Sequence, residues 1–187
     1  MIKFKKLKSR GVYMEILDVY DKYKTLTGKK ILKGQYNELL QGEYTLLTYV
    51  AIFNSENEML IQKRQAELDR HPNLWDISAS GHVISGETSD EAIERKLYEE
   101  LGHKHEFVED LAYFTINNNK SFGDVYIIND DIDINDLRLD YKKVQNDTWA
   151  TKDEILQLIE EEKFIPYTEG FIELLFFNKD KRGVLKF

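Results

Sequence analysis

Apolar and polar residues follow two periods along this chain, one typical of strands and one of helices. The richest apolar run covers residues 46–53, and a turn at 54–57 connects it to a second strand, which predicts a hairpin. The full set of predicted strands is 15–20, 46–53, 58–63, 107–117, 125–128 and 144–149. Residues 15–20 alternate as an edge strand would, and residues 21–30, with Thr27 and Gly28, indicate a turn.

The strongest helical pattern covers residues 88–101, where apolar side chains recur on one stripe. Thr88 or Ser89 is suited to cap its start, and Gly102 is suited to end it. Two further helices are predicted at 152–161 and 168–178. Strands mixed with helices in this order predict an α/β sandwich, in which helices pack on the faces of a mixed sheet.

The chain reads as one domain, because it has only two prolines and no Gly/Ser-rich linker. We place that domain at residues 14–187. Residues 1–13 precede the first predicted strand and form an N-terminal arm, either disposable or the product of an overextended start. They lack the apolar stretch of a signal peptide, and no run of 18 apolar residues predicts a membrane span.

Composition narrows the functional classes. The 187 residues carry 26 basic and 34 acidic side chains, a net charge of −8, which disfavours a nucleic-acid surface. An acidic protein can still bind a phosphate compound when a cation bridges the two. The absence of cysteine excludes disulfides, thiolate metal sites and thiol catalysis, and it fits a cytoplasmic protein.

The most informative spacing runs from Gly81 through Glu87, Arg95, Glu99 and Glu100 to a second glycine at 102. On a helix, Arg95 and Glu99 share a face, and the planar guanidinium is suited to hold Glu87 or Glu99. Adjacent carboxylates at 99 and 100 can bind one hard cation from neighbouring angles, as Mg²⁺ prefers. Gly81 has no side chain, so the backbone there could approach a metal or phosphate.

The alternative is a solvated helix that carries only surface ion pairs. A surface helix, however, has no use for the distant Glu87 or for glycines at both ends of the pattern.

The same stretch resembles the Nudix box, G-x5-E-x7-R-E-U-x-E-E-x-G-U, in which U is aliphatic. Matching positions are Gly81, Glu87, Arg95, Leu97, Glu99, Glu100 and Gly102. Segments 59–64 and 72–78 resemble the Nudix branch related to type I isopentenyl-diphosphate isomerase. The resemblance covers residues 14–178 and implies an α/β/α sandwich whose box forms a loop–helix–loop beneath a substrate diphosphate.

Two positions depart from the box. Lys96 replaces a glutamate that binds metal or acts as general base in many members, and His103 replaces an aliphatic residue. An ammonium at Lys96 would compete with a cation for Glu99 and Glu100 or would contact the substrate phosphate. We therefore expect fewer metal ions, and a base from elsewhere or slow hydrolysis. Asp124 is the candidate extra ligand or base.

The resemblance leaves three functional readings. The first is a hydrolase that cleaves a diphosphate-containing small molecule with Mg²⁺, or Mn²⁺, on Glu99 and Glu100. The second is an isomerase, which we disfavour because Ser80 stands where those enzymes have a cysteine and only His82 matches their metal-binding histidines. The third is a Nudix-fold protein that binds a diphosphate ligand without turnover because of Lys96.

For hydrolysis, the predicted roles divide into three groups. The catalytic set is Glu87, Arg95, Glu99 and Glu100; the substrate-binding set is Arg64, His82 and Lys96; the metal-binding set is Gly81, Glu99, Glu100 and Asp124. The expected substrate is a nucleoside or coenzyme diphosphate. An edge strand at 15–20 would allow a homodimer.

Overall fold

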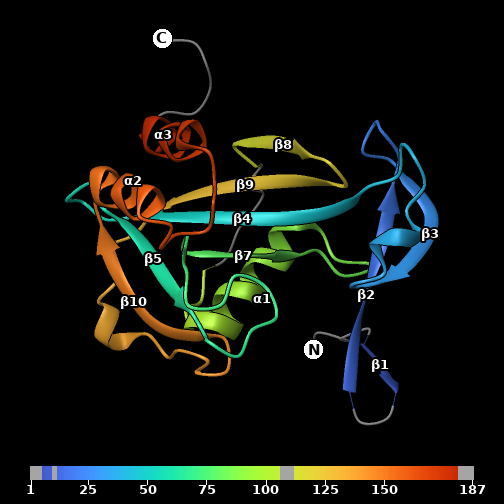
Figure 1. The fold of residues 1–187 in the computed structure, drawn as a ribbon, viewed down its shortest axis with the longest axis horizontal. Coiled ribbons are helices and arrows are strands. Elements are labelled where there is room, and N and C mark those ends of the chain that lie inside the picture. Colours follow the sequence, from blue (N-terminus) through green and yellow to red (C-terminus); the bar gives the residue numbers. More distant parts are fainter. Residues whose placement is uncertain (1–5, 10–11, 106–111, 181–187) are drawn as a thin grey trace.

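The computed structural model describes residues 6–9, 12–105 and 112–180, with side chains from residue 14 onward, and Figure 1 shows their arrangement. The strands are β1 (Lys6–Ser9), β2 (Val12–Tyr20), β3 (Leu26–Leu32), β4 (Thr45–Phe53), β5 (Met59–Arg64), β6 (Trp75–Asp76), β7 (Ala79–His82), β8 (Phe114–Asn118), β9 (Ser121–Asn129) and β10 (Val144–Ala150). The α-helices are α1 (Ser89–Leu101), α2 (Lys152–Glu160) and α3 (Glu169–Asn178), and short 3-10 helices lie at η1 (Tyr36–Glu38) and η2 (Ile134–Asp136).

A seven-stranded mixed sheet forms the centre of the molecule. Its main path is β10-β5-β4-β9-β8, with β6 paired to β5 and β7 paired to β4. Strands β4 and β9 are parallel, and the other pairs are antiparallel. Thr48 on β4 stands between Gly81 on β7 and Asp124 on β9. The mixed sheet predicted from the sequence is therefore confirmed.

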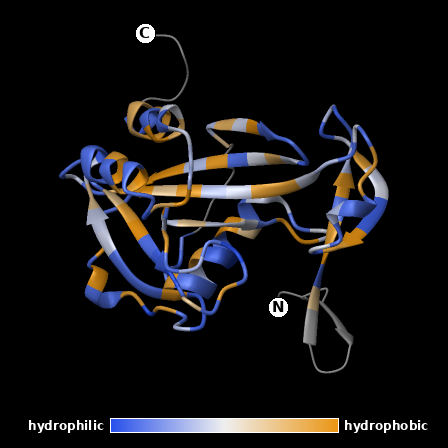
Figure 2. Ribbon diagram, viewed as in Figure 1, coloured by the Kyte–Doolittle hydropathy of each residue, from blue (hydrophilic) through white to orange (hydrophobic). Residues whose placement is uncertain are grey.

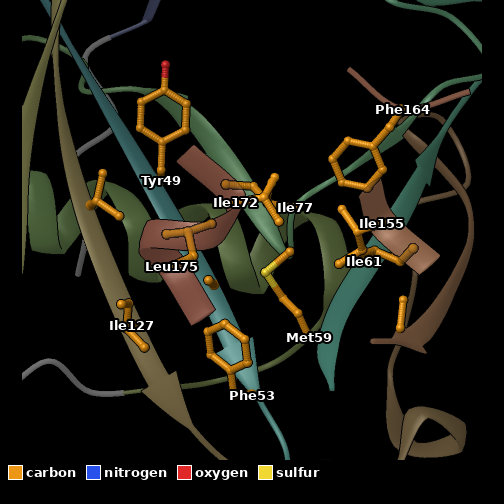
Figure 3. Packing of buried hydrophobic residues seen from close by; sticks show 13 residues of the cluster. Tyr49, Phe53, Met59, Ile61, Ile77, Ile127, Ile155, Phe164, Ile172 and Leu175 are labelled. Atoms are coloured by element: carbon orange, nitrogen blue, oxygen red, sulfur yellow. The ribbon is translucent and has the colours of Figure 1, made fainter. Parts of the chain in front are cut away.

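Helices cover both faces of this sheet, as Figure 1 shows. Alternate residues of β4 point to opposite faces, so Val50 and Ile52 pack with α1 while Tyr49 and Phe53 pack with α2 and α3. Figure 3 shows the second of these clusters, where Ile172 and Leu175 of α3 lie beside Tyr49, Phe53 and Met59. Two cores on one sheet confirm the α/β/α sandwich.

Strands β1, β2 and β3 form a smaller antiparallel sheet beside the central one, and this corrects two expectations. Residues 15–20 do not form an edge strand, because β2 lies between β1 and β3. Beyond the sheet, Tyr20 and Tyr44 also bond each other's main chains, at 2.8 and 2.9 Å. The suggested basis for dimer pairing through 15–20 is therefore removed.

Residues 21–30 do not form one turn either. The turn is confined to the first five residues, where Asp21 accepts the main-chain N–H of Lys24 and donates its own to Thr25. Strand β3 then starts at Leu26. Gly28 misled the sequence reading because it lies inside that strand at φ +83°, opposite a register shift in β2. A glycine in a strand interior marks such an irregularity as readily as it marks a turn.

The remaining elements agree closely with the sequence. All three predicted helices are confirmed within one or two residues. The predicted strand at 107–117 is represented by β8, and residues 107–111 lie outside the described residues. Within the predicted arm 1–13, the described residues form β1 and the start of β2, and the arm's separate status stays a prediction.

Figure 2 shows that hydrophobic residues concentrate on the central strands, while α1 and α2 carry mostly hydrophilic positions. Among the described residues, no helix combines the length and apolar character needed to cross a membrane.

Candidate active site

The site is built on α1 and on the β7–α1 loop that precedes it. Thr88 caps the helix: its side chain accepts the main-chain N–H of Glu91, and the Glu91 carboxylate accepts the N–H of Thr88. At the other end, Gly102 adopts a left-handed conformation with φ +67° and donates its N–H to Tyr98. The sequence spacing therefore fixes where the helix starts and ends.

Arg95 holds the β7–α1 loop against the helix. Its Nε and Nη2 donate to the two carboxylate oxygens of Glu87 at 2.8 and 2.9 Å, and Nη2 also donates to the carbonyl of His82 at 3.1 Å. Glu87 in turn accepts the N–H of Ile84 at 3.3 Å. Burial lowers the pKa of Arg95, but Glu87 outweighs it, so the net shift is upward. Arg95 also lies 3.6 Å from Glu99, so the guanidinium contacts both carboxylates that the sequence offered as its partners.

Lys96 and Glu100 form a second ion pair, one residue further along the same helix. The Lys96 Nζ donates to Glu100 Oε1 at 2.7 Å, and Gln62 Nε2 donates to Oε2 at 3.1 Å. Burial raises the pKa of Glu100, but Lys96 more than compensates, and the net shift is downward. Burial lowers the pKa of Lys96, and Glu100 more than reverses that shift. Both groups are thus held in their charged forms.

Gly81 faces the Lys96 side chain. A Cβ added at position 81 would lie 2.0 Å from Lys96 Cε and 3.0 Å from Cδ. The missing side chain at 81 therefore makes room for Lys96, and the lysine occupies the space through which the sequence reading brought the backbone toward a metal.

Glu99, the other carboxylate of the adjacent pair, is more accessible. Its side chain is 24% exposed, compared with 9% for Glu100. Lys143, which directly precedes β10, donates to Glu99 Oε2 at 3.2 Å. Each of the two adjacent carboxylates therefore already contacts an ammonium group. Sequence reasoning missed Lys143, because nothing in its neighbourhood marks a lysine that meets α1 across 44 residues.

The small sheet adds charged and aromatic residues to the same region. Glu15 accepts a 2.6 Å hydrogen bond from Lys33, and its charge acts on Arg95 and Lys96. Burial lowers the Glu15 pKa less than its neighbours do in the opposite direction only in magnitude of burial's upward effect, so the net shift is downward. The sequence gave no signal for these contacts, since they depend on how the small sheet is placed.

His82 is buried at the end of β7. Its Nε2 lies 2.8 Å from the Tyr36 hydroxyl, and its Nδ1 has no hydrogen-bond partner among the described residues. Burial, reinforced by the Lys33 ammonium, lowers the pKa of His82 to about 3. The ring is therefore neutral near pH 7, with one nitrogen available to a ligand.

Arg64 contacts the loop that follows β5. Its Nε donates to the carbonyl of His71 at 3.2 Å and its Nη2 to the carbonyl of Arg70 at 3.0 Å. Its Nη1 lies 3.6 Å from Asp76, a carboxylate that also accepts a hydrogen bond from Tyr167 at 2.9 Å. Burial raises the pKa of Asp76 to about 6.

Asp124 belongs to a different group of contacts. Lys24 and Thr115 both donate to its Oδ1. The charges that act most on Lys96 are those of Glu100, Glu15 and Glu99. The structure thus brings together Gly81, His82, Glu87, Arg95, Lys96, Glu99 and Glu100, whereas Asp124 is paired elsewhere.

Comparisons with known proteins agree with this arrangement. The NUDIX domain model matches residues 44–180. A Nudix hydrolase of Listeria monocytogenes, itself described as uncharacterized, is 38% identical over 154 residues, which cover 82% of this chain and 90% of the relative. An isopentenyl-diphosphate Delta-isomerase of Pectobacterium atrosepticum is 36% identical over 63 residues, covering 34% of this chain and 35% of the isomerase.

Among solved structures, the protein DR0079 of Deinococcus radiodurans superposes with a TM-score of 0.70 at 22% identity, covering 86% of this chain and 97% of that one. That likeness supports the fold alone. The family model and the Listeria relative go further, because one covers more than half of the chain and the other exceeds 30% identity over most of both sequences. The chain therefore belongs to the Nudix family of pyrophosphohydrolases.

Proposed function

We propose that the protein hydrolyses a diphosphate linkage in a nucleoside diphosphate derivative or a similar small molecule, with Mg²⁺ held by Glu99 and Glu100. Mn²⁺ is the expected substitute. The observation that carries the proposal is the pair of adjacent carboxylates at the end of α1, each of which already contacts an ammonium. A position that stabilises two positive groups has the charge that a divalent cation requires.

The donor chemistry fits a hard cation. Nudix enzymes generally use divalent metal ions, and Mg²⁺ prefers carboxylate and phosphate oxygens together with water. Glu100 is kept ionised in this structure, and Glu99 is partly exposed, so both can supply oxygens. When bound, the cation supplies neutralisation of diphosphate charge and lowers the pKa of bound water. Asp124 stays outside the proposed metal site, because Lys24 and Thr115 already occupy its carboxylate.

Lys96 would change partners during binding. Its ammonium occupies Glu100 Oε1 in the structure, and it must leave that oxygen before the oxygen can coordinate a metal. The side chain is long and flexible, and the free ammonium would then contact the phosphate oxygens of the substrate. Lys96 therefore balances the charge of Glu100 before the ligand arrives and adds to substrate binding afterwards.

The other predicted residues position or contact the substrate. Arg95 and Glu87 fix the loop and helix that present the two carboxylates, and neither needs to move. His82 offers its buried Nδ1 as a neutral hydrogen-bonding group. Arg64 acts through the loop at 70–71, which its guanidinium holds by two carbonyl oxygens. We place the protein in the cytoplasm, consistent with its lack of cysteine.

A release assay tests this proposal. The purified protein would be screened for phosphate and pyrophosphate release from nucleoside di- and triphosphates, nucleotide sugars, dinucleotides, coenzymes and an isoprenoid diphosphate, with Mg²⁺ and Mn²⁺ in parallel. Glu100→Gln removes one proposed ligand, and Glu160→Gln, on the exposed side of α2, is the matched control. We expect metal-dependent hydrolysis that falls about 100-fold or more in Glu100→Gln, a loss typical of a group that stabilises transition-state charge.

The control variant should retain the activity of the original protein. Melting curves would show whether Glu100→Gln is folded under the assay conditions. Hydrolysis that persists at the same rate in folded Glu100→Gln would contradict the assignment of the metal site. Ligand-dependent thermal stabilisation without any product would contradict hydrolysis itself and favour a binding protein.

A further inference from the structure

A second cluster of potential metal ligands lies outside the proposed diphosphate site. His103 and His105 follow α1, and Asp130 follows β9. One potential ligand atom from each of these three side chains lies within 4.8 Å of the other two. In the part of the chain that the structure describes, no other group of three His, Asp or Glu side chains comes together this closely.

The backbone fixes both sides of the cluster. Gly102 ends α1 with a left-handed φ of +67°, and the carbonyl of Leu101 accepts the N–H of Arg138 at 2.8 Å, so the residue before His103 is anchored. On the other side, the N–H of Asp130 donates to the carbonyl of Phe53 at 2.9 Å. Two segments far apart in sequence are thereby held in place, and their side chains meet.

One nitrogen in this cluster lacks a hydrogen bond. His103 Nε2 is buried and has no hydrogen-bond partner among the described residues, although Asp130 Oδ2 lies only 3.4 Å away. A buried polar atom without a partner is costly and calls for an explanation, and an unmodelled ion is one of the usual ones. Two ligands that each lie about 2.1 Å from one tetrahedral metal are about 3.4 Å apart, which matches this pair.

We propose that His103, His105 and Asp130 form a binding site for a zinc-class divalent cation. Two imidazole nitrogens and one carboxylate oxygen suit Zn²⁺, Co²⁺ or Ni²⁺, whereas Mg²⁺ prefers oxygen ligands alone. A small rotation of His105 brings the three atoms, now within 4.8 Å, to bonding distance of one ion. The ion would connect the segment after α1 to the end of β9 and would stabilise the folded protein. This site is independent of the diphosphate site and of its proposed function.

The test uses the full chain after treatment with a chelator. Zn²⁺ binding would be measured by calorimetry in the presence of millimolar Mg²⁺, and Co²⁺ absorption would report the ligand geometry. We expect one equivalent of Zn²⁺ to bind and to raise the melting temperature. His103→Gln and His105→Gln should each weaken Zn²⁺ affinity at least tenfold and abolish the rise in melting temperature, while Mg²⁺-dependent hydrolysis stays unchanged.

His71→Gln is the matched control, because His71 is exposed and lies outside the cluster. Glu100→Gln separates the two sites, since Zn²⁺ binding at the diphosphate site would weaken in that variant alone. The proposal is overturned if Zn²⁺ binds with unchanged affinity to both histidine variants, or if the original protein takes up no Zn²⁺ at 100-micromolar concentrations, roughly the upper limit for a specific site. Should one histidine variant fail to fold, the other and Asp130→Asn provide the same comparison.

Discussion

Two buried ion pairs on consecutive residues of α1 differ in how they are held. The Arg95 guanidinium makes two hydrogen bonds to Glu87 and a third to a main-chain carbonyl, and its side chain is only 4% exposed. Lys96 makes one hydrogen bond to Glu100, from a flexible side chain that passes over Gly81. A planar fork with several partners is fixed by its geometry, whereas a single ammonium contact can be exchanged.

The difference separates structural from functional charge in the site. Arg95 connects the loop to the helix and gains nothing by moving. Lys96 occupies an oxygen that the proposed metal requires, so its contact has to be temporary. Two basic residues side by side in the sequence therefore contribute in different ways, one to the shape of the site and the other to its occupancy.

Replacing Arg95 should have the largest effect on stability. Arg95→Met leaves Glu87 buried without its guanidinium, and we expect the free energy of unfolding to fall by about 3–5 kcal/mol, the usual cost of breaking a buried pair. Lys96→Met removes one charged hydrogen bond and should cost about 1–3 kcal/mol. Urea denaturation of both variants measures the difference. Equal losses would show that the two pairs are equally structural.

A smaller effect is expected from Gly81→Ala. The new Cβ would displace Lys96 from its present path, and we expect a loss of about 1–2 kcal/mol in the free energy of unfolding, in the range of a forced side-chain shift. Because the obstacle is the lysine side chain, the loss should disappear when Lys96→Ala is present as well. A double-mutant cycle by denaturation gives the coupling. A cost that persists without the lysine would place the strain in the backbone instead.

The smallest effect concerns acid stability. Lys96 holds the pKa of Glu100 below its ordinary value of 4.5, despite burial. A lowered carboxyl pKa contributes stability that is present above pH 4.5 and is lost as the pH falls through the folded-state pKa. The stability difference between the original protein and Glu100→Gln should therefore shrink below about pH 4.5. Asp76, with its pKa raised to about 6, acts alike in both proteins and cancels from the difference.

That comparison would be made by denaturation at closely spaced pH values between 7 and 3. A difference that stays constant over this range would mean that Glu100 titrates alike in the folded and unfolded chains, against the strong pairing with Lys96.

The parts of the site that depend on local spacing could be predicted from the sequence. The helix limits, the cap at Thr88 and the reach of Arg95 to Glu87 all follow from residues close together in the chain. The contacts of Lys143 with Glu99 and of Lys24 with Asp124 could not, since they join residues 44 and 100 positions apart. Long-range pairing depends on strand register and loop paths, which one sequence does not specify.

The fold shows the same division. Apolar runs and helix signals predicted the sandwich, because each element's pattern matches its face of the sheet. The small sheet was partly missed, because Gly28 suggested a turn while it lies in a strand irregularity. The position of Lys33 and Tyr36 beside His82 follows from that sheet and was therefore out of reach as well.

The central claim is that Lys96 competes with a divalent cation for Glu100. Calorimetric titration of Mg²⁺ into the chelator-treated protein and into Lys96→Met tests it directly, with Lys22→Met as an exposed control for the loss of one positive charge. Removing a charged hydrogen bond of about 1.5 kcal/mol from the competing state should tighten Mg²⁺ binding at least about tenfold in Lys96→Met and leave Lys22→Met unchanged. Equal or weaker Mg²⁺ binding by folded Lys96→Met would contradict the claim and assign Lys96 a purely structural role.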